Sequence, residues 1–521
     1  MLMATAPHVL CGGHGRDIQT ELSVFWRLYE QVQPDHVVYQ RDPATRPFTL
    51  PVLIHGDEGR YLKKANWMVC MVEPALGSNP DKKVHEACQC AEDSRLRRCG
   101  NIGQGDQSDL DAVTAGSHQQ VNDSGNEFLT KFCVFGMSSV VYKQRPGLLE
   151  AAFAMVARDM QVLHEQGFDS NGVTYYASTL GVKGDLKFFH QLGGLTRSYY
   201  NAGTKENHPI CHLCMAGQDG CDFEDLSETA AWLGTMYTQK PWTRMPALAT
   251  IPCEQAPEAV FKFDLFHCWK VGLGRDLTGS STMALALLGY FDFSPEDSTA
   301  LPERLKRAHS LFVLWCKAES KSPALHSFTP ALLNYKNLRS FCWFNTKGSD
   351  TTLITQWLHF FVRASRLDGG PRHPALEAAM LETLESAIEL FGLLHRHPLW
   401  LPRACAKLAE YHMTVMTKGY KVLARECHSN LDIVGFGFKP RLHSVDHIRR
   451  DLKRQLQRNA ARIINPMAFS CESNESFVGH VSRLARRLNS RTVGHEVLDR
   501  ICYNIKGQIR ESKARLRTRR R

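Results

Sequence analysis

The sequence lacks long apolar runs. None of its 521 residues belongs to an uninterrupted stretch of 18 apolar residues, so we expect no membrane-spanning helix. The first residues contain no sustained apolar segment after a basic start, which argues against a secretory signal peptide. A Walker A loop, a dinucleotide-binding glycine fingerprint and an internal repeat are also missing from the sequence.

Cysteine is present, but it is not spaced as a disulfide framework. The 17 Cys residues are scattered through a long chain, which favours a reducing compartment in which thiols are buried or bind metal. The net charge of +10 is concentrated at one end. Between Arg441 and Arg521 there are 20 Lys and Arg against 7 Asp and Glu, a net +13, so the first 440 residues sum to −3. This basic region indicates a polyanion partner and a nuclear location, with a solvated, disordered tail as the alternative.

The apolar periodicity predicts a mixed α/β protein. The predicted elements are, in chain order, a helix over Ile18–Val32, a strand over Pro51–His55 that leads into a glycine-rich turn, strands from Asn66 and from Phe128, a helix over Pro146–Gln166 and a strand over Val173–Leu180. The core order is therefore β-β-β-α-β. RNase H-like folds have this order, with three antiparallel strands followed by a helix and a parallel fourth strand.

We therefore expect an RNase H-like core of mixed sheet that a large, mostly helical insertion interrupts. The expected parts are a helical lead-in at 1–50, the first part of the core at 51–200, the insertion at 201–440, the closing part of the core at 441–500 and a basic tail at 501–521. Residues 77–126 are polar and have no period, which is typical of a loop or a disordered insert. Helical patterns recur from about Ile210 to Val434.

Two acidic residues follow strands of this predicted core. Asp57 lies in IHGDEG after the first strand, and Asp185 lies in VKGD at the end of the fourth, where RNase H-like folds carry their first two acids. Phosphodiester cleavage by in-line attack uses two divalent cations, and carboxylates are ligands that Mg²⁺ prefers. Because Asp is also common in glycine turns, a structural role is the alternative for each residue.

Two pairs of residues have the spacing of zinc ligands. Cys211 and Cys214 form the knuckle CHLC, and His443 and His447 are four residues apart on one face of a predicted helix. A structural zinc ion takes four ligands, so the pairs together predict a Cys2His2 site that spans more than 220 residues. Ordinary surface histidines are the alternative for the second pair. The rival ligands are His212, Cys221, Cys253, His267 and Cys268.

A third group lies in FKFDLFHCWKVGLGRDL, where Asp264 and His267 are three residues apart at the start of a helical pattern. The aromatic residues around Asp264 indicate a buried position. We interpret Asp264 as a structural hydrogen-bonding residue, with a role in a functional site as the alternative.

In this order the motifs resemble those of the CACTA (En/Spm) group of transposases. The series is HGDEG, GVKGD, CHLC, FDLFHCWKVG, LHSVDH and CESNESFVGHVSRLARRLN, and it spans roughly residues 51–500. The group shares the order of an Asp-Gly turn, a Gly-Asp, a CxxC knuckle, a His-led helix and an HxxxH. A helix led by Glu and followed by a Gly and basic residues closes the series.

The resemblance implies a third acid, which composition and spacing do not. Glu475 matches best, since an aromatic residue, an aliphatic residue and Gly follow it as in the family, although Ser476 stands where Arg is usual. Glu472, one helical turn earlier, is an alternative. Asp350 is another, but Ser349 or Asp350 is more simply interpreted as a helix N-cap.

The resemblance implies a DNA transposase that cleaves DNA and transfers strands in the nucleus. Asp57, Asp185 and Glu475 would hold Mg²⁺ or Mn²⁺, and the Cys2His2 site would hold a structural Zn²⁺. The expected DNA contacts are Arg483, Arg486 and Arg487. A homodimer or higher oligomer on DNA is the expected assembly. The alternatives are a non-catalytic, transposase-derived DNA-binding or scaffold protein, and a zinc-stabilised protein of unrelated fold.

Overall fold

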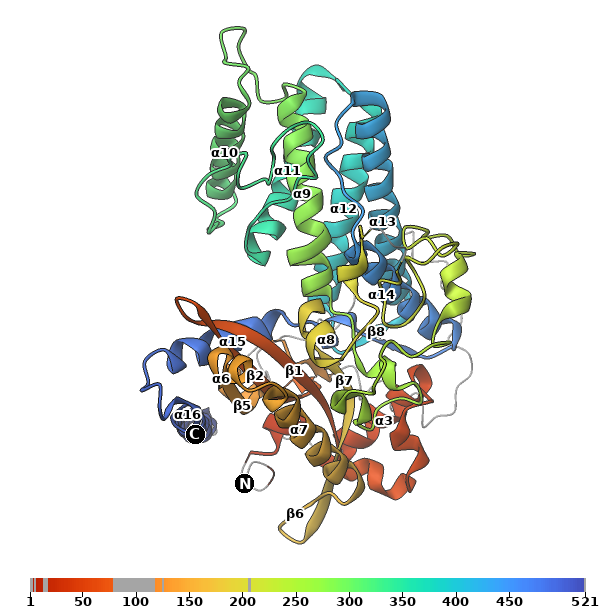
Figure 1. The fold of residues 1–521 in the computed structure, drawn as a ribbon, viewed down its shortest axis with the longest axis vertical. Helices are drawn as coiled ribbons and strands as arrows, with labels where there is room; N and C mark the ends of the chain where they lie inside the picture. The colour runs from red at the N-terminus through yellow and green to blue at the C-terminus, as the bar shows by residue number, and fades with distance from the viewer. Residues whose placement is uncertain are drawn as a thin grey trace.

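A five-stranded mixed sheet and a group of long helices form the two ends of the molecule (Figure 1). The computed structural model describes residues 3, 6–12, 17–77, 118–123, 126–204 and 208–519, with side chains up to residue 511. The predicted insert at 77–126 lies mostly outside these residues. Its described ends pair as β3 (Leu76–Gly77) and β4 (Gln120–Val121).

The sheet has the strand order β5-β2-β1-β7-β6. Its strands are β1 (Thr49–Leu62), β2 (Ala65–Pro74), β5 (Phe132–Ser138), β6 (Phe168–Ser170) and β7 (Val173–Lys183). β1 pairs with β2, and β2 with β5, in antiparallel fashion, whereas β7 runs parallel to β1. The predicted order of three antiparallel strands, a helix and a parallel strand is therefore present. The short β6 adds an antiparallel hairpin to β7.

The predicted glycine turn after the first strand is wrong. β1 continues through IHGDEG, so that Asp57 is paired with Val69 and Gly59 with Trp67. The two glycines are explained by packing. A Cβ atom on Gly56 would lie 2.2 Å from the Phe188 ring, and one on Gly59 would lie 2.0 Å from Ser482 Oγ. Because these two glycines have no side chain, the helix that contains Phe188 can pack on the strand at Gly56, and the helix that contains Ser482 can pack on it at Gly59.

The third strand begins four residues later than predicted. Phe128 lies in the short helix α5 (Glu127–Thr130), because the Asn126 side chain accepts a hydrogen bond from its backbone amide at 3.0 Å. Beyond the strand, α6 (Ser139–Gln144) leads to α7 (Leu148–Glu165), which matches the predicted helix. The apolar side of α7 covers the sheet, where Phe153 contacts Phe135 and Phe188 edge to face.

The insertion is helical only in its later part. Residues 210–261 form turns and short 3₁₀ helices, contrary to prediction, because the Cys211–Cys214 knuckle and frequent proline and glycine interrupt any helical repeat. The α-helices that flank or build the insertion are α8 (Leu186–Leu192), α9 (Gly274–Leu287), α10 (Leu301–Ala318), α11 (Gly348–Gly369), α12 (Pro374–Arg396) and α13 (Arg403–Leu431). Helices α9 to α13 stand together above the sheet in Figure 1.

The chain then returns to the sheet. Helix α14 (Pro440–Gln457) packs against α13, and β9 (Arg462–Ile464) pairs with β8 (Trp400–Pro402). The last two helices are α15 (Glu472–Ala485), which lies on β1, and α16 (Val493–Arg519). Residues 501–519 of the predicted basic tail therefore continue a helix. At the other end of the chain, α3 has the predicted bounds, Ile18–Val32. No helix in the described ranges is long and apolar enough to span a membrane.

Candidate functional site

The first two predicted acids lie side by side at one end of the parallel strand pair. In the register of β1 and β7, His55 is opposite Lys183, and Asp57 and Asp185 each follow two residues later. Asp185 caps α8, since its carboxylate accepts a hydrogen bond from Phe188 N at 2.6 Å. The strand carries Asp57 to this position, and the turn between β7 and α8 carries Asp185.

Glu475 joins these two acids from α15. Burial raises the pKa of the Asp57 carboxyl well above its ordinary value, and the charges of Glu475 and Asp185 raise it further, whereas His267 opposes them. The three carboxylates therefore interact electrostatically, although 128 residues separate the first pair and 290 the second. The fold brings together the acids that strand order and the family resemblance singled out.

The two alternatives to Glu475 as third acid, Glu472 and Asp350, form contacts with other residues. Both carboxylate oxygens of Glu472 lie 2.7 Å from Lys270 Nζ. Asp350 is buried near the start of α11 and accepts a hydrogen bond from Ala324 N at 2.8 Å. The N-cap residue of α11 is Lys347, so neither Ser349 nor Asp350 caps it as predicted. Of the three candidates, Glu475 is the one that interacts with Asp57.

Asp264 and His267 form a hydrogen-bonded hub behind Glu475. Asp264 Oδ1 accepts hydrogen bonds from the backbone of His267 (3.0 Å) and Cys471 (3.3 Å), and Oδ2 lies 3.0 Å from His267 Nδ1. The other ring nitrogen, Nε2, lies 3.4 Å from Glu475 Oε1. Burial opposes protonation of His267, but Asp264 outweighs it and holds the pKa of the imidazole well above its ordinary value. The hub thus connects the π-helix Phe266–Leu273 to the start of α15.

The acid cluster has the electrostatic character of a cation site. A bound cation would lower the pKa of Asp57 again, because an opposite charge favours the ionised carboxylate. Glu475 Oε1 is buried, and its neighbour is the His267 ring, whose Nε2 lies 3.4 Å away. Within the described ranges, these acids are not among the groups whose ligand atoms all lie within 4.8 Å of one another. Carboxylates are nonetheless the donors that Mg²⁺ and Mn²⁺ prefer, so the chemistry of the three residues fits these ions.

The predicted zinc ligands converge in the interior of the protein. Cys211, Cys214, His443 and His447 are all buried, and their ligand atoms lie within 4.8 Å of one another. Cys211 Sγ is 3.4 Å from His447 Nε2, and Cys214 Sγ is 3.3 Å from His443 Nε2. Tetrahedral zinc bonds of roughly 2.0–2.3 Å would separate sulfur from nitrogen by about 3.5 Å. The four residues could hold a zinc ion.

Aromatic side chains surround this Cys2His2 cluster. The Trp232 ring lies 4.5 Å from the His443 ring and 5.0 Å from the His447 ring, and Phe263 stacks on His447 at 5.5 Å. The backbone amide of Leu213 donates to Cys211 Sγ, as expected in a thiolate knuckle. The rival ligands His212, Cys221, Cys253, His267 and Cys268 do not belong to this four-residue group.

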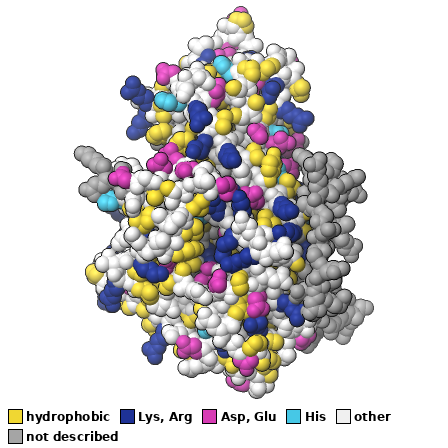
Figure 2. Space-filling model, turned by 90° about the vertical axis from the view of Figure 1, so that its right-hand side faces the viewer, with side chains coloured by type: hydrophobic (Ala, Val, Ile, Leu, Met, Phe, Trp, Pro, Cys, Tyr) yellow, Lys and Arg dark blue, Asp and Glu magenta, His cyan; other side chains and the backbone are white. Residues whose placement is uncertain are grey.

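The three arginines predicted to contact DNA are exposed. Arg483 lies in the last turn of α15, and Arg486 and Arg487 lie in the turn that follows it. They therefore extend from the helix that carries Glu475. A different face, shown in Figure 2, has Lys and Arg concentrated around its middle, but Asp and Glu are interspersed among them.

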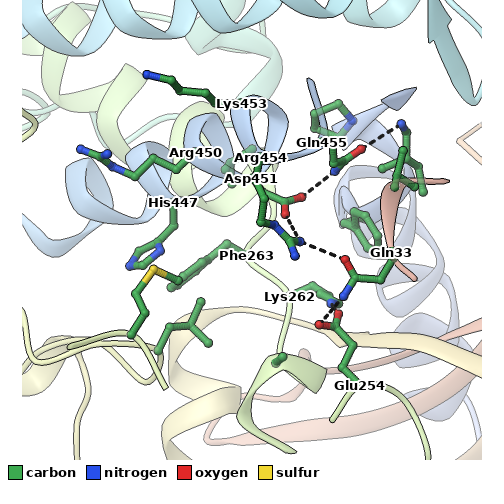
Figure 3. Close-up of a pocket in the computed structure, with 18 of the residues that line it drawn as sticks. Gln33, Glu254, Lys262, Phe263, His447, Arg450, Asp451, Lys453, Arg454 and Gln455 are labelled. Carbon is green, nitrogen blue, oxygen red and sulfur yellow. Dashed lines mark hydrogen bonds and ion pairs between the residues drawn. The ribbon is translucent and has the colours of Figure 1, made fainter. Parts of the chain in front are cut away.

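A pocket of about 370 Å³ lies between α3, the knuckle segment and α14 (Figure 3). Its polar side is a chain of paired groups. Gln33 Nε2 donates to Glu254 at 2.7 Å, and Arg454 donates to Gln33 Oε1 at 2.9 Å and to Asp451 at 2.5 Å. Lys262 forms an ion pair with Glu254. These contacts fasten the end of α3 to α14, the helix that carries His443 and His447.

The mixed sheet, the acid cluster and the Cys2His2 cluster define the class of the protein as an α/β protein with two candidate metal sites. No protein-family model matches the chain, and no curated protein matches it either.

Sequence reasoning missed a set of buried polar residues beneath the acids. Glu73, Lys183 and Asn474 are each at most 1% exposed, and Glu73 contacts both of the others. Lys183 and Asn474 lie close in sequence to Asp185 and Glu475, which is the only signal that the sequence offered.

Proposed function

We propose that this protein is a metal-dependent DNA-cleaving and strand-transferring enzyme of the CACTA transposase type, built on an RNase H-like core. The observation that carries the proposal is the electrostatic cluster of Asp57, Asp185 and Glu475 where the parallel pairing of β1 with β7 ends. The strand order β5-β2-β1-β7 and the parallel pairing of β1 with β7 support the fold assignment. The motif order of the sequence supports the family assignment.

In this proposal the three carboxylates bind two Mg²⁺ or Mn²⁺ ions between them. When bound, such ions polarise the phosphodiester and lower the pKa of the attacking hydroxyl or water. The chain's own residues fix the site. Asp185 is oriented by the amide of Phe188, and the His267 ring lies beside Glu475. Exposed Arg483, Arg486 and Arg487 would hold DNA phosphates next to the acids.

The Cys2His2 cluster has a structural role in the proposal. A structural zinc site is closed by four protein ligands, and aromatic side chains cover this cluster. It ties the start of the insertion to α14, from which the chain returns toward α15. Zinc would therefore help deliver Glu475 without contacting DNA.

The test is the replacement Asp185→Asn, assayed for Mg²⁺-dependent cleavage of DNA that carries the ends of the element in which the gene lies. We expect the variant to lose cleavage by at least about a hundredfold, because one ligand charge is removed. Asp159→Asn, on the exposed side of α7, is the matched control and is expected to cleave normally. If wild type and Asp185→Asn are equally inert, the enzyme assignment is wrong.

A second candidate function is DNA binding without cleavage. The observation that favours it is the net +13 of residues 441–521, which is spread over this whole region and includes 7 Lys and Arg against 3 Asp and Glu on α16. A protein of this kind would bind DNA with an affinity that falls steeply with salt, and it would bind equally well after Asp185→Asn. Binding together with inert wild-type protein would support this candidate.

A further inference from the structure

A buried ion pair crosses the sheet directly below the acid cluster. Lys183 Nζ lies 2.5 Å from Glu73 Oε1, and both residues are 1% exposed. Glu73 is on β2 and Lys183 ends β7, so the pair spans the intervening strand β1. Glu73 is opposite Leu53 and Lys183 is opposite His55. Because residues two apart on a strand share a face, both charges lie on the face that carries Asp57.

The same pair holds the start of α15. Lys183 Nζ donates a hydrogen bond to Ser470 O at 2.8 Å. The second oxygen of Glu73 accepts a hydrogen bond from Asn474 Nδ2 at 2.9 Å, and Asn474 is fully buried. Asn474 immediately precedes Glu475, and Ser470 lies five residues before it. Two strands of the sheet and the helix that carries the third acid therefore meet at one ion pair.

Hydrophobic stability alone does not account for this arrangement. Removing two charges from water costs several kcal/mol per ion, and a well-packed apolar pair is often at least as stabilising. What charges add is directional bonding, since an ammonium and a carboxylate accept only a few relative positions. The neighbouring His55 ring is fully buried without hydrogen bonds, so the ion pair and its partners supply the polar contacts that fix α15 on this face.

We propose that Glu73, Lys183 and Asn474 are positioning residues that set the distance of Glu475 from Asp57 and Asp185. They bind neither DNA nor metal. They act through α15, by holding its first turn against the ends of β2 and β7. This inference rests on the proposed function for its catalytic consequence, but its structural part is independent of it.

The experiment replaces the ion pair by apolar and neutral groups of similar size, Glu73→Gln/Lys183→Met. Removing both charges leaves neither partner of the pair buried alone, but the buried Lys131 loses the nearby charge of Glu73, so thermal stability is measured alongside and the readouts are taken at temperatures where the variant is folded. Two readouts separate positioning from stability. Amide hydrogen exchange in residues 472–478 is expected to be at least about tenfold faster. Titration with Mn²⁺ is expected to show at least about tenfold weaker binding at the acids.

The control is a second ion pair, Asp276→Asn/Lys439→Met, whose partners lie 2.5 Å apart in the insertion, with Asp276 buried and Lys439 partly exposed. Neither readout should change there. Unchanged exchange in α15 of the Glu73/Lys183 double variant would overturn the inference, whatever the activity. Faster exchange with unchanged Mn²⁺ affinity would overturn the positioning role. Wild-type protein that binds Mn²⁺ but cleaves no DNA would instead count against the proposed function and leave the positioning of the metal site supported.

Discussion

His36 is a buried histidine that is held in its neutral form. The residue is fully buried; its Nε2 lies 3.0 Å from Thr179 O, and its Nδ1 accepts a hydrogen bond from Val38 N at 3.2 Å. The tautomer with hydrogen on Nε2 satisfies both contacts, whereas the imidazolium would lose the second. Burial lowers the pKa of His36 to about 3, and burial likewise lowers that of His164 to about 4.

These histidines make the protein sensitive to acid. Between pH 6.5, the ordinary pKa, and pH 3 the unfolded chain binds a proton that native His36 does not, so the free energy of unfolding falls as the pH is lowered. We expect His36 to contribute about 1.4 kcal/mol per pH unit to this loss. Denaturant unfolding at several pH values measures the slope.

His36→Gln is expected to reduce the slope of the free energy of unfolding against pH by the contribution of one proton. Glutamine keeps a donor for Thr179 O but does not titrate. His495, with 86% of its side chain exposed, supplies the control His495→Gln, which should leave the slope unchanged. A slope that is equal in wild type and His36→Gln would show that His36 titrates normally in the folded protein.

The contact of β1 with α15 is the element pair on which the acid cluster depends. Gly59 lies where the helix crosses the strand, and an added Cβ atom would meet Ser482 Oγ at 2.0 Å and Val478 Cγ1 at 2.9 Å. The nearest atoms belong to the buried face of the helix, so the helix as a whole has to move. Glu475 lies on the same helix, less than one turn from Val478.

We therefore expect Gly59→Ala to lower the free energy of unfolding by roughly 1–3 kcal/mol, the usual cost of overpacking, and to weaken Mn²⁺ binding at the acids. Calorimetry and metal titration measure the two effects. Gly507→Ala on α16 is the control, because nothing lies within 4 Å of the added Cβ there and alanine favours a helix. Equal stability of Gly59→Ala and wild type would contradict the close packing of α15 on β1.

Elements with strong, uninterrupted patterns could be predicted from the sequence, whereas elements shaped by distant partners could not. The helix Ile18–Val32 was predicted to the residue, since one apolar face repeats through it. The continuation of β1 past Gly56 was missed because two glycines normally indicate a turn. Their reason is the packing of two distant helices, α8 on Gly56 and α15 on Gly59, the second more than 400 residues away. The start of β5 was misplaced because the Asn126 cap competes with the strand pattern.

The parts of the candidate site that could be predicted are those whose signals lie within a few neighbouring residues of the sequence. Asp57 and Asp185 were singled out by strand order, and the Cys2His2 cluster, which could hold a zinc ion, was predicted from two short spacings. Glu475 came only through resemblance, because a helix that begins with glutamates has no unique meaning. The ion pair of Glu73 and Lys183 was invisible, since charged residues in strands usually indicate an exposed face and the pairing crosses a third strand.

On the scale of the whole molecule, the Cys2His2 cluster joins segments that lie about 230 residues apart. One half belongs to a segment with little regular structure, residues 210–261, and the other half to α14. The first segment has only short 3₁₀ helices, which lack the cooperative hydrogen bonding of a long helix, so we expect its fold to depend in part on the cluster. We therefore expect a metal ion bound at the cluster to stabilise more of the protein than the Cys211–Cys214 knuckle alone.

We expect the purified protein to contain about one tightly held zinc ion per chain and Cys214→Ser to lose it, with a fall in the free energy of unfolding of roughly 3 kcal/mol or more. Elemental analysis and thermal unfolding measure both effects. Cys221→Ser is the control, because Cys221 is buried beside the knuckle but is not a member of the cluster. Zinc that is retained after Cys211→Ser combined with His443→Ala would rule out this cluster as the binding site.

The position of Glu475 late in the chain also affects when the acid cluster can form during synthesis. Asp57 and Asp185 emerge from the ribosome early, but the third acid follows Asp185 by 290 residues. At about 5–20 residues per second, the first two carboxylates wait roughly 15 to 60 s for their partner. During that interval the nascent chain has no complete acid cluster. A protein with the proposed activity would thus be unable to cut DNA until nearly all of it has been made, and fragments that end before α15 would be harmless.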